Sequence, residues 1–243
     1  MDKEIKYAFV TGASGEIGQE ICLSLARAGW NLYIHYHQNK QAIESLLPQL
    51  LVESVEVILI QADFDDVASV MAMEKQVFQI DAFIHAAGNS HYALFQDMTD
   101  KEITKLWNVH MFVPMQLIRT FTPKLMKSNQ GRIVFISSIW GEVGAAMEVA
   151  YSTVKGAQIA FCRALSQEFG PSGITVNVIA PGVVQTKMMD SFSSEEQVML
   201  REEIPFKRFA KPAEIADTVE FITSKKASYI TGEVLRINGG WLM

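Results

Sequence analysis

The sequence has little cysteine, no long apolar run and no excess of basic residues. Its two cysteines, Cys22 and Cys162, are too few for a disulfide framework or a four-ligand zinc site, and they favour a reducing compartment. No apolar run approaches the ~18 residues of a membrane-spanning helix, and the first four residues do not resemble a signal sequence, so we expect no membrane association and a cytoplasmic location. The net charge of −6 disfavours nucleic acid as the main partner, because phosphate binding needs a basic face.

Linkers, repeats and charge blocks are also missing from the sequence. The 243 residues, 49% of them hydrophobic, are enough for one sizeable core or at most two small ones. We therefore expect residues 1–243 to form a single domain.

Short β-branched runs alternate with longer amphipathic stretches along the chain. The predicted strands cover residues 7–10, 32–35, 55–60, 82–85, 132–136, 174–179 and 234–237. This alternation indicates βαβ units, and right-handed crossovers place helices on both faces of a parallel sheet. The sequence thus predicts an α/β fold with a single Rossmann-like, doubly wound parallel sheet of about seven strands. Ligands of such sheets bind beyond the carboxyl ends of the strands.

The first predicted strand runs into a turn with several glycines, residues 11–18. Glycines between a strand and a helix let the backbone approach a phosphate, and the helix N-terminus offers unpaired N–H groups. No Gly-Lys-Ser/Thr follows, which excludes a P-loop, while an ordinary glycine-rich turn stays open as the alternative. Small residues after the third and fourth strands, Ala62-Asp63 and Ala86-Ala87-Gly88, suit either a flat ligand or tight packing.

A serine, a tyrosine and a lysine form the strongest constellation. Ser138 ends the fifth predicted strand, and Tyr151 and Lys155 lie one helical turn apart at the start of the next helix. A nearby ammonium favours phenolate, so we expect the pKa of Tyr151 to fall from about 10 toward neutrality. Tyr151 would then donate a proton to a carbonyl oxygen that Ser138 also hydrogen-bonds. A surface helix pair is the alternative, which the glycine turn and Ser138 together disfavour.

In this order the motifs resemble the short-chain dehydrogenase/reductase family over essentially the whole chain. The matching positions are Thr11-Gly12, Gly18, Asp63, Ala86-Ala87-Gly88, Ser138, Tyr151, Lys155, Asn177, Pro181-Gly182, Thr186 and Gly239-Gly240. The resemblance implies hydride transfer between NAD(H) or NADP(H) and a ketone/alcohol pair, without a metal. It implies that Tyr151 is the general acid in reduction, that Lys155 holds the nicotinamide ribose and lowers the tyrosine pKa, and that Ser138 polarises the carbonyl.

The resemblance also assigns the coenzyme-binding residues. They are Gly12, Ser14, Gly15, Ile17, Gly18, Tyr36, His37, Asp63, Ala86, Ala87, Gly88, Tyr151, Lys155, Pro181, Gly182, Val184 and Thr186. Asp63 would meet the adenine, Gly88 the adenine ribose side, and residues 181–186 the nicotinamide.

Three residues depart from the family pattern. Glu16 occupies the middle glycine position of the turn, where a carboxylate beside phosphates must point away or weaken binding. His85 replaces the usual asparagine before Ala86. His110 replaces the asparagine whose backbone anchors a water in the family's proton relay. Because imidazole can donate and accept, His110 either keeps a relay, as a further catalytic residue, or fills the space.

The coenzyme preference depends on the end of the second strand. Family members that prefer NAD usually carry an acid there, which binds the ribose 2′-hydroxyl. Tyr36 stands at that position, so no carboxylate opposes a 2′-phosphate that His37 or Lys40 could help to hold. The family's usual basic residue in the glycine turn is missing at Gly15. On balance the sequence favours NADP(H) over NAD(H).

The overall pattern is closest to 3-oxoacyl-(acyl-carrier-protein) reductases. Residues 35–39, 138–141, 148–151 and 154–158 further resemble the bacterial branch that reduces 5-aminopentanone attached to elongation factor P. Asn129 and Ser172 stand where carrier-protein reductases usually present arginines for docking. We therefore expect elongation factor P rather than acyl carrier protein as the partner, unless Arg132, Arg163 or Lys207 takes the place of the missing docking arginines.

The resemblance carries three further expectations. A small-molecule or protein-borne ketone is the substrate, with a mobile lid over residues 186–210. The chain forms a homo-oligomer, a dimer or tetramer, through the helices around residues 101–126 and 151–169. A non-enzymatic dinucleotide sensor on the same scaffold is the alternative, but such sensors typically lose the tyrosine and lysine that are intact here.

Overall fold

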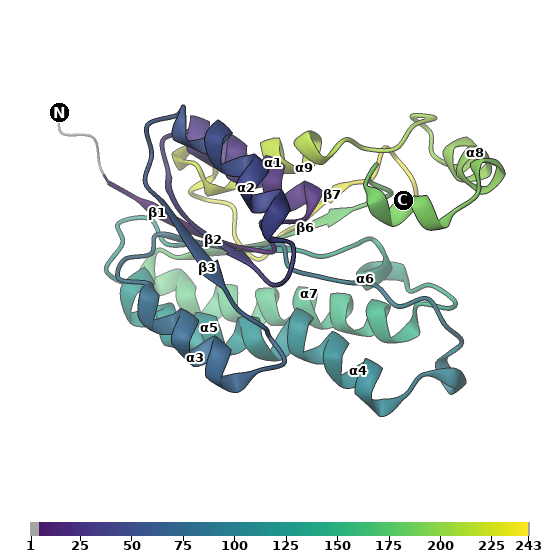
Figure 1. Ribbon diagram of the computed structural model, residues 1–243, viewed down its shortest axis with the longest axis horizontal. Coiled ribbons are helices and arrows are strands. Elements are labelled where there is room, and N and C mark those ends of the chain that lie inside the picture. Colours follow the sequence, from purple (N-terminus) through teal and green to yellow (C-terminus); the bar gives the residue numbers. More distant parts are fainter. Residues whose placement is uncertain (1–4, 243) are drawn as a thin grey trace.

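The computed structural model describes residues 5–242 and arranges them around one seven-stranded sheet (Figure 1). The strands lie in the order β3-β2-β1-β4-β5-β6-β7, and every neighbouring pair is parallel. Their bounds are β1 (Tyr7–Thr11), β2 (Asn31–Tyr36), β3 (Val57–Gln61), β4 (Ala82–His85), β5 (Arg132–Ile136), β6 (Thr175–Pro181) and β7 (Val234–Ile237). The predicted doubly wound parallel sheet is confirmed.

Helices cover both faces of the sheet, as Figure 1 shows. One layer holds α1 (Glu16–Arg27), α2 (Lys40–Leu51) and α9 (Pro212–Thr223); the other holds α3 (Val67–Gln76), α4 (Asp100–Trp107), α5 (Val113–Leu125) and α7 (Val149–Phe169). Each layer packs on its own apolar core. In α1, for example, Ile21, Cys22 and Leu25 recur at helical spacing and are all fully buried.

Four strands have bounds that differ from the sequence prediction. β1 extends one residue further, to Thr11, and β2 extends one residue at each end, to Asn31 and Tyr36. β3 begins two residues later than predicted, because its pairing with β2 starts where Leu32 faces Val57. β6 begins at Thr175 and continues to Pro181, opposite Ile237 of β7. In parallel sheets both faces are buried, so apolar runs extend beyond the paired residues and blur the ends.

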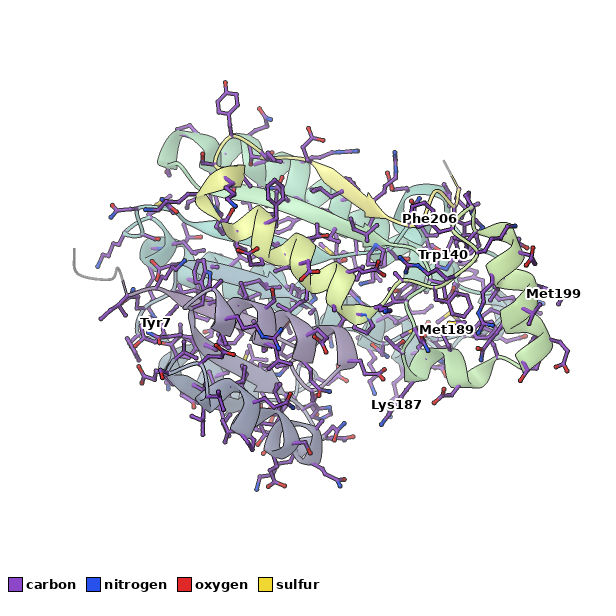
Figure 2. The ribbon with its side chains drawn as sticks, turned by 90° about the horizontal axis from the view of Figure 1, so that it is seen from above. Tyr7, Trp140, Lys187, Met189, Met199 and Phe206 are labelled. Atoms are coloured by element: carbon purple, nitrogen blue, oxygen red, sulfur yellow. The ribbon has the colours of Figure 1, made fainter. Side chains whose placement is uncertain are left out.

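The chain between β6 and α9, residues 182–211, leaves the sheet and lies beyond the carboxyl ends of the strands. It contains η4 (Lys187–Ser191) and α8 (Ser194–Glu203), and α8 begins with a capping box formed by Ser193 and Glu196. This β6–α9 segment packs through Met189, Ile204 and Phe209 against residues that include Ile139, Trp140 and Trp241. Figure 2 shows Trp140 and Met189 close together in that cluster, with Met199 on the outer side of α8.

No helix within residues 5–242 combines the length and apolarity needed to cross a membrane.

Candidate active site

The carboxyl ends of β1, β4, β5 and β6 bring the predicted site residues to one edge of the sheet. Thr11 faces His85 at the ends of β1 and β4, and Ile136 faces Ile179 near the ends of β5 and β6. The backbone N–H of Ile139 donates to the carbonyl of Pro181, at 3.0 Å. Segments that are far apart in sequence therefore form one continuous surface.

Gly12 allows the turn after β1 to lie directly against the turn after β4. Its φ is +70°, and a Cβ at this position would lie 2.5 Å from the Cα of Ala87. The hydroxyl of Thr11 accepts a 3.2 Å hydrogen bond from the backbone N–H of Ala87 and so fixes the same two turns. The close approach requires glycine, as the motif indicates.

The N-terminus of α1 fits a phosphate group. Gly15 is the N-cap residue and provides no side-chain cap for the first N–H groups of α1. Gly15 is exposed, and Ser14 and Ile17 beside it are half-buried. Because the helix dipole places partial positive charge at this end, the diphosphate of a dinucleotide could be held here.

The Glu16 side chain at the N-terminus of α1 is held by the β6–α9 segment. Its carboxylate accepts a 2.6 Å hydrogen bond from the backbone N–H of Lys187, at the start of η4. The side chain is thus directed to the β6–α9 segment, as expected for a carboxylate that must point away from phosphates.

The end of β2 differs from the expected coenzyme contacts. Tyr36 is 6% exposed and packs in the core beneath α1 and α2, so its ring is part of the fold. His37, the next residue, is exposed, and its Nε2 lies 3.3 Å from Oδ2 of Asp63. His37 and Asp63, which were assigned separately to the phosphate and the adenine, therefore form one pair.

His35 is a structural part of the site that sequence reasoning missed. Its Nδ1 accepts a 3.2 Å hydrogen bond from the N–H of Gly12, and its Nε2 lies 3.1 Å from the carbonyl oxygen of Ala62. Burial lowers the pKa of His35 to about 4, so the imidazole is neutral near pH 7. The signal was a histidine inside an otherwise apolar strand, because a buried polar side chain needs partners.

Ser138, Tyr151 and Lys155 converge at the carboxyl end of β5. A hydrogen bond joins Tyr151 to Ser138. The Lys155 ammonium donates to the carbonyl of Ile136 at 2.8 Å and lies 5.4 Å from the centre of the Tyr151 ring. The predicted trio is therefore assembled, with Tyr151 half-buried and Lys155 and Ser138 buried.

The expected effect of Lys155 on the tyrosine is wrong for this arrangement. Burial raises the pKa of Tyr151 above its ordinary value, the Glu148 carboxylate adds to the rise, and the Ser138 hydrogen bond opposes it. Burial lowers the pKa of Lys155 to about 7. Because the ammonium is directed to a backbone carbonyl, Tyr151 stays a neutral phenol, which is the protonated form that an acid requires.

His110 lies in a π-helical turn, η2 (Asn108–Phe112), between α4 and α5. Its ring packs edge-on against Tyr151, with centroids 5.6 Å apart, and its Cε1 would lie 2.7 Å from a Cβ at Gly88. Nε2 lies 2.9 Å from the carbonyl oxygen of Asn89, whereas Nδ1 has no hydrogen-bond partner among residues 5–242. Burial first, and then the Lys155 charge, lower the pKa of His110 to about 3.

Gln158 is a second residue that sequence reasoning did not assign to the site. It is fully buried on α7, and its Nε2 donates to the backbone carbonyl of His110 at 2.9 Å. This carbonyl belongs to the position whose backbone anchors water in the family pattern. A buried glutamine one turn after Lys155 was the available signal.

The remaining assigned residues lie around the same edge. His85 is fully buried; its Nδ1 lies 2.9 Å from the Thr11 hydroxyl, and burial holds its pKa well below the ordinary value. Ala86 and Gly88 follow β4, and Gly88 is exposed. After β6, Gly182 donates its N–H to Ile237, Val184 pairs with Ala210, and Thr186 is half-buried beside η4.

The sequence profile described as enoyl-(acyl carrier protein) reductase matches residues 12–242. The chain belongs to the short-chain dehydrogenase/reductase family. It is 42% identical over 238 residues to the uncharacterized oxidoreductase YmfI of Bacillus subtilis (strain 168), covering 97% of this chain and 98% of that protein. It is 33% identical over 245 residues to the 3-oxoacyl-[acyl-carrier-protein] reductase FabG of Staphylococcus aureus (strain Mu50), covering 99% of this chain and all of FabG.

Solved structures of short-chain dehydrogenases/reductases share this fold. The 3-oxoacyl-[acyl-carrier protein] reductase of Brucella melitensis aligns with a TM-score of 0.90 and 26% identity, over 99% of this chain and 92% of its own. YwfH, an NADPH-dependent reductase involved in bacilysin biosynthesis, aligns with the same TM-score of 0.90 over 98% of both chains. At 24% identity, that second likeness shows the fold alone.

Proposed function

We propose that this short-chain dehydrogenase/reductase is an NADPH-dependent carbonyl reductase. The observation that carries the proposal is the neutral phenol of Tyr151, hydrogen-bonded to Ser138 and packed beside the buried Lys155. An acid with its proton in place, next to a second hydroxyl, is the arrangement that carbonyl reduction needs.

Each member of the trio has one task in this proposal. A reduced nicotinamide, when bound, supplies the hydride that the carbonyl carbon receives. Ser138 donates a hydrogen bond to the carbonyl oxygen and polarises it, and Tyr151 gives that oxygen its phenolic proton. Lys155, which is anchored on Ile136, holds the nicotinamide ribose beside Tyr151.

His110 acts as a neutral imidazole in this account. Its edge fixes the Tyr151 ring, and Gln158 fixes its backbone carbonyl from the opposite helix. In reduction, a relay has to return a proton to Tyr151 after the phenol has given its own to the substrate. Nδ1 of His110, which has no hydrogen-bond partner among residues 5–242, is the atom through which such a relay would pass.

NADPH is the proposed coenzyme. His37 stands at the exposed end of β2 beside the turn that ends in α1, and Lys40 begins α2. Asp63, which follows β3, is paired with His37, and no carboxylate lies on β2 itself among Asn31–Tyr36. A 2′-phosphate would take the place of the Asp63 carboxylate as the partner of His37. The NADPH dependence of YwfH, a fold neighbour, is consistent with this choice.

The proposed substrate is a protein-borne ketone, the aminopentanone on elongation factor P, and 3-oxoacyl-acyl carrier protein is the second candidate. The likeness to FabG supports the second. Against it, Asn129 and Ser172 are neutral, and Arg132 is only 1% exposed at the start of β5, so it cannot compensate in docking. Electrostatic docking of a strongly acidic carrier protein needs exposed basic side chains. Of Arg132, Arg163 and Lys207, the last two are exposed.

We further propose that residues 1–243 act as one domain in the cytoplasm, with residues 186–210 as a substrate lid. Exposed apolar residues on the α4–α5 helices, Trp107, Phe112 and Met115, support homo-oligomerisation through that layer.

Three substrates at one salt concentration test the proposed function. The measurement is kcat/KM for NADPH oxidation with a carrier-bound 3-oxo chain, the free thioester of that chain, and modified elongation factor P. We expect the elongation factor to be preferred and the carrier to give little advantage over the thioester. A hundredfold preference for the carrier-bound ketone that is lost in high salt would instead favour a role in fatty-acid synthesis. If no ketone supports oxidation of NADPH, carbonyl reduction is excluded.

A further inference from the structure

Glu148 stands next to the reactive tyrosine and has no role in the site described so far. It is the N-cap residue of α7, three positions before Tyr151. Its side chain is half-buried and does not cap the N–H groups of α7. The negative charge is felt at Tyr151, where it adds to the effect of burial on the tyrosine pKa.

The loop that carries Glu148 is held in place on both sides. The N–H of Ala93, in the loop after β4, donates to the carbonyl of Met147 at 2.9 Å. The N–H of Ala145 donates to the hydroxyl of Ser152 at 3.1 Å, and Met147 adopts a φ of +65°. A left-handed conformation at a non-glycine residue persists only where the surroundings fix it, so the position of Glu148 is built into the loop.

Within residues 5–242, no ion pair or side-chain hydrogen bond joins the Glu148 carboxylate to another residue, so no cationic side chain of this part of the chain balances its charge. Acids on neighbouring segments are paired: Glu142 accepts bonds of 2.8 and 2.7 Å from Arg236, and Glu102 lies 3.4 Å from His91.

Burial raises the pKa of Glu148, because a partly desolvated carboxylate is less stable as an anion. The ammonium of Lys155, one helical turn beyond Tyr151, is directed to Ile136 instead of to this carboxylate. A ligand with a positive charge beside the Glu148 carboxylate would therefore stabilise the anion through an ion pair.

We infer that Glu148 selects ketones that carry a positive charge, such as an alkylammonium, a few bonds from the carbonyl. The inference rests on the proposed carbonyl reduction and names the substrate class for the same site. The N–H of Trp140 donates to the hydroxyl of Ser138 at 3.2 Å, and the Trp140 ring packs edge-on against Trp241 with centroids 5.3 Å apart, so aromatic rings lie close to Ser138. Aromatic faces attract alkylammonium groups, and a carboxylate repels anionic chains.

Two ketones of nearly equal shape isolate the charge. Trimethyl(4-oxopentyl)ammonium is the cationic substrate, and 6,6-dimethylheptan-2-one is the neutral one, in which carbon replaces nitrogen. Neither can cyclise. The measurement is the ratio of their kcat/KM values with NADPH, for the parent, for Glu148→Gln and for Asp217→Asn. Asp217 is an exposed carboxylate on α9, outside the proposed lid, and its replacement changes the net charge equally.

We expect the parent and Asp217→Asn to prefer the cation by about tenfold or more, and Glu148→Gln to lower that preference to about twofold or less. A purely structural role for Glu148 at the start of α7 would change both ketones together and leave the ratio unmoved. Equal ratios in the parent and in Glu148→Gln, with both ketones reduced, would overturn this inference alone. Failure of the parent to reduce either ketone while it reduces modified elongation factor P or the carrier-bound ketone would overturn this inference alone. Failure with these ketones and with all three substrates named above would overturn the proposed function and this inference with it.

Discussion

The carboxylate of Glu16 accepts a 2.6 Å hydrogen bond from the backbone N–H of Lys187, 171 residues further along the chain. The bond ties the N-terminus of α1 to the start of η4, where the β6–α9 segment leaves the sheet. The same helix N-terminus is where a diphosphate would be held, and both groups are negative. Glu16 therefore connects coenzyme binding to the segment that we propose as the lid.

Replacement of Glu16 separates its charge from its hydrogen bond. Glu16→Gln keeps an acceptor for Lys187, and Glu16→Gly restores the glycine of the family pattern and removes the acceptor. We expect both variants to bind NADPH about three- to tenfold more tightly, because a negative charge leaves the phosphate site. Hydrogen exchange at the Lys187 amide should become faster only in Glu16→Gly. Unchanged affinity in both variants would show that the carboxylate does not oppose the phosphates.

Coenzyme choice depends on His37 in this account. His37→Asn should weaken NADPH binding by about tenfold and change NADH binding by less than about twofold, because the 2′-phosphate loses the imidazole as a hydrogen-bond partner. Titration of the purified protein with each coenzyme gives both affinities. Equal losses for NADPH and NADH would mean that His37 supports the fold of the turn and does not read the phosphate.

Three buried histidines should make the protein sensitive to acid. Burial lowers the pKa of His35 to about 4, that of His110 to about 3, and that of His85 well below its ordinary value. Each remains neutral in the folded state while the unfolded chain takes up a proton below pH ~6.5, so stability is complete above that pH and is lost as the pH falls.

Urea unfolding between pH 7.5 and 4.5 measures this loss. Below pH ~6 the free energy of unfolding should fall by up to about 1.4 kcal/mol per pH unit for each buried histidine. His35→Asn should reduce the dependence of the unfolding free energy on pH by the contribution of one histidine, which is at most about 1.4 kcal/mol per pH unit. A flat profile would show that these imidazoles are protonated in the folded state.

The sequence predicted the sheet because apolar, β-branched runs buried on both faces leave few other arrangements. β4, β5 and β7 have the predicted bounds, and Ser138, Tyr151 and Lys155 meet as their spacing suggests. Sequence proximity could not predict the direction of the Lys155 ammonium, because its acceptor, Ile136, lies on a different element. The Tyr151 pKa depended on that direction.

The side-chain arrangement at the end of β2 could not be predicted from the sequence for a similar reason. Successive strand residues point to opposite faces, so a single position decides whether a side chain reaches the core or the site. Tyr36 points into the core beneath α1, and the exposed His37 meets Asp63, which follows β3. The hydrogen bond between Glu16 and Lys187 could not be predicted for another reason, because contacts between residues so far apart in sequence depend on the complete fold.

Substitution of Tyr151 by phenylalanine tests the central claim most directly. Tyr151→Phe keeps the ring that packs against His110 and removes the phenolic proton and the bond with Ser138. With saturating NADPH and a ketone that the parent reduces, kcat should fall by about a thousandfold, while the affinity for NADPH stays within about twofold of the parent. A kcat within about tenfold of the parent would contradict the assignment of Tyr151 as the acid.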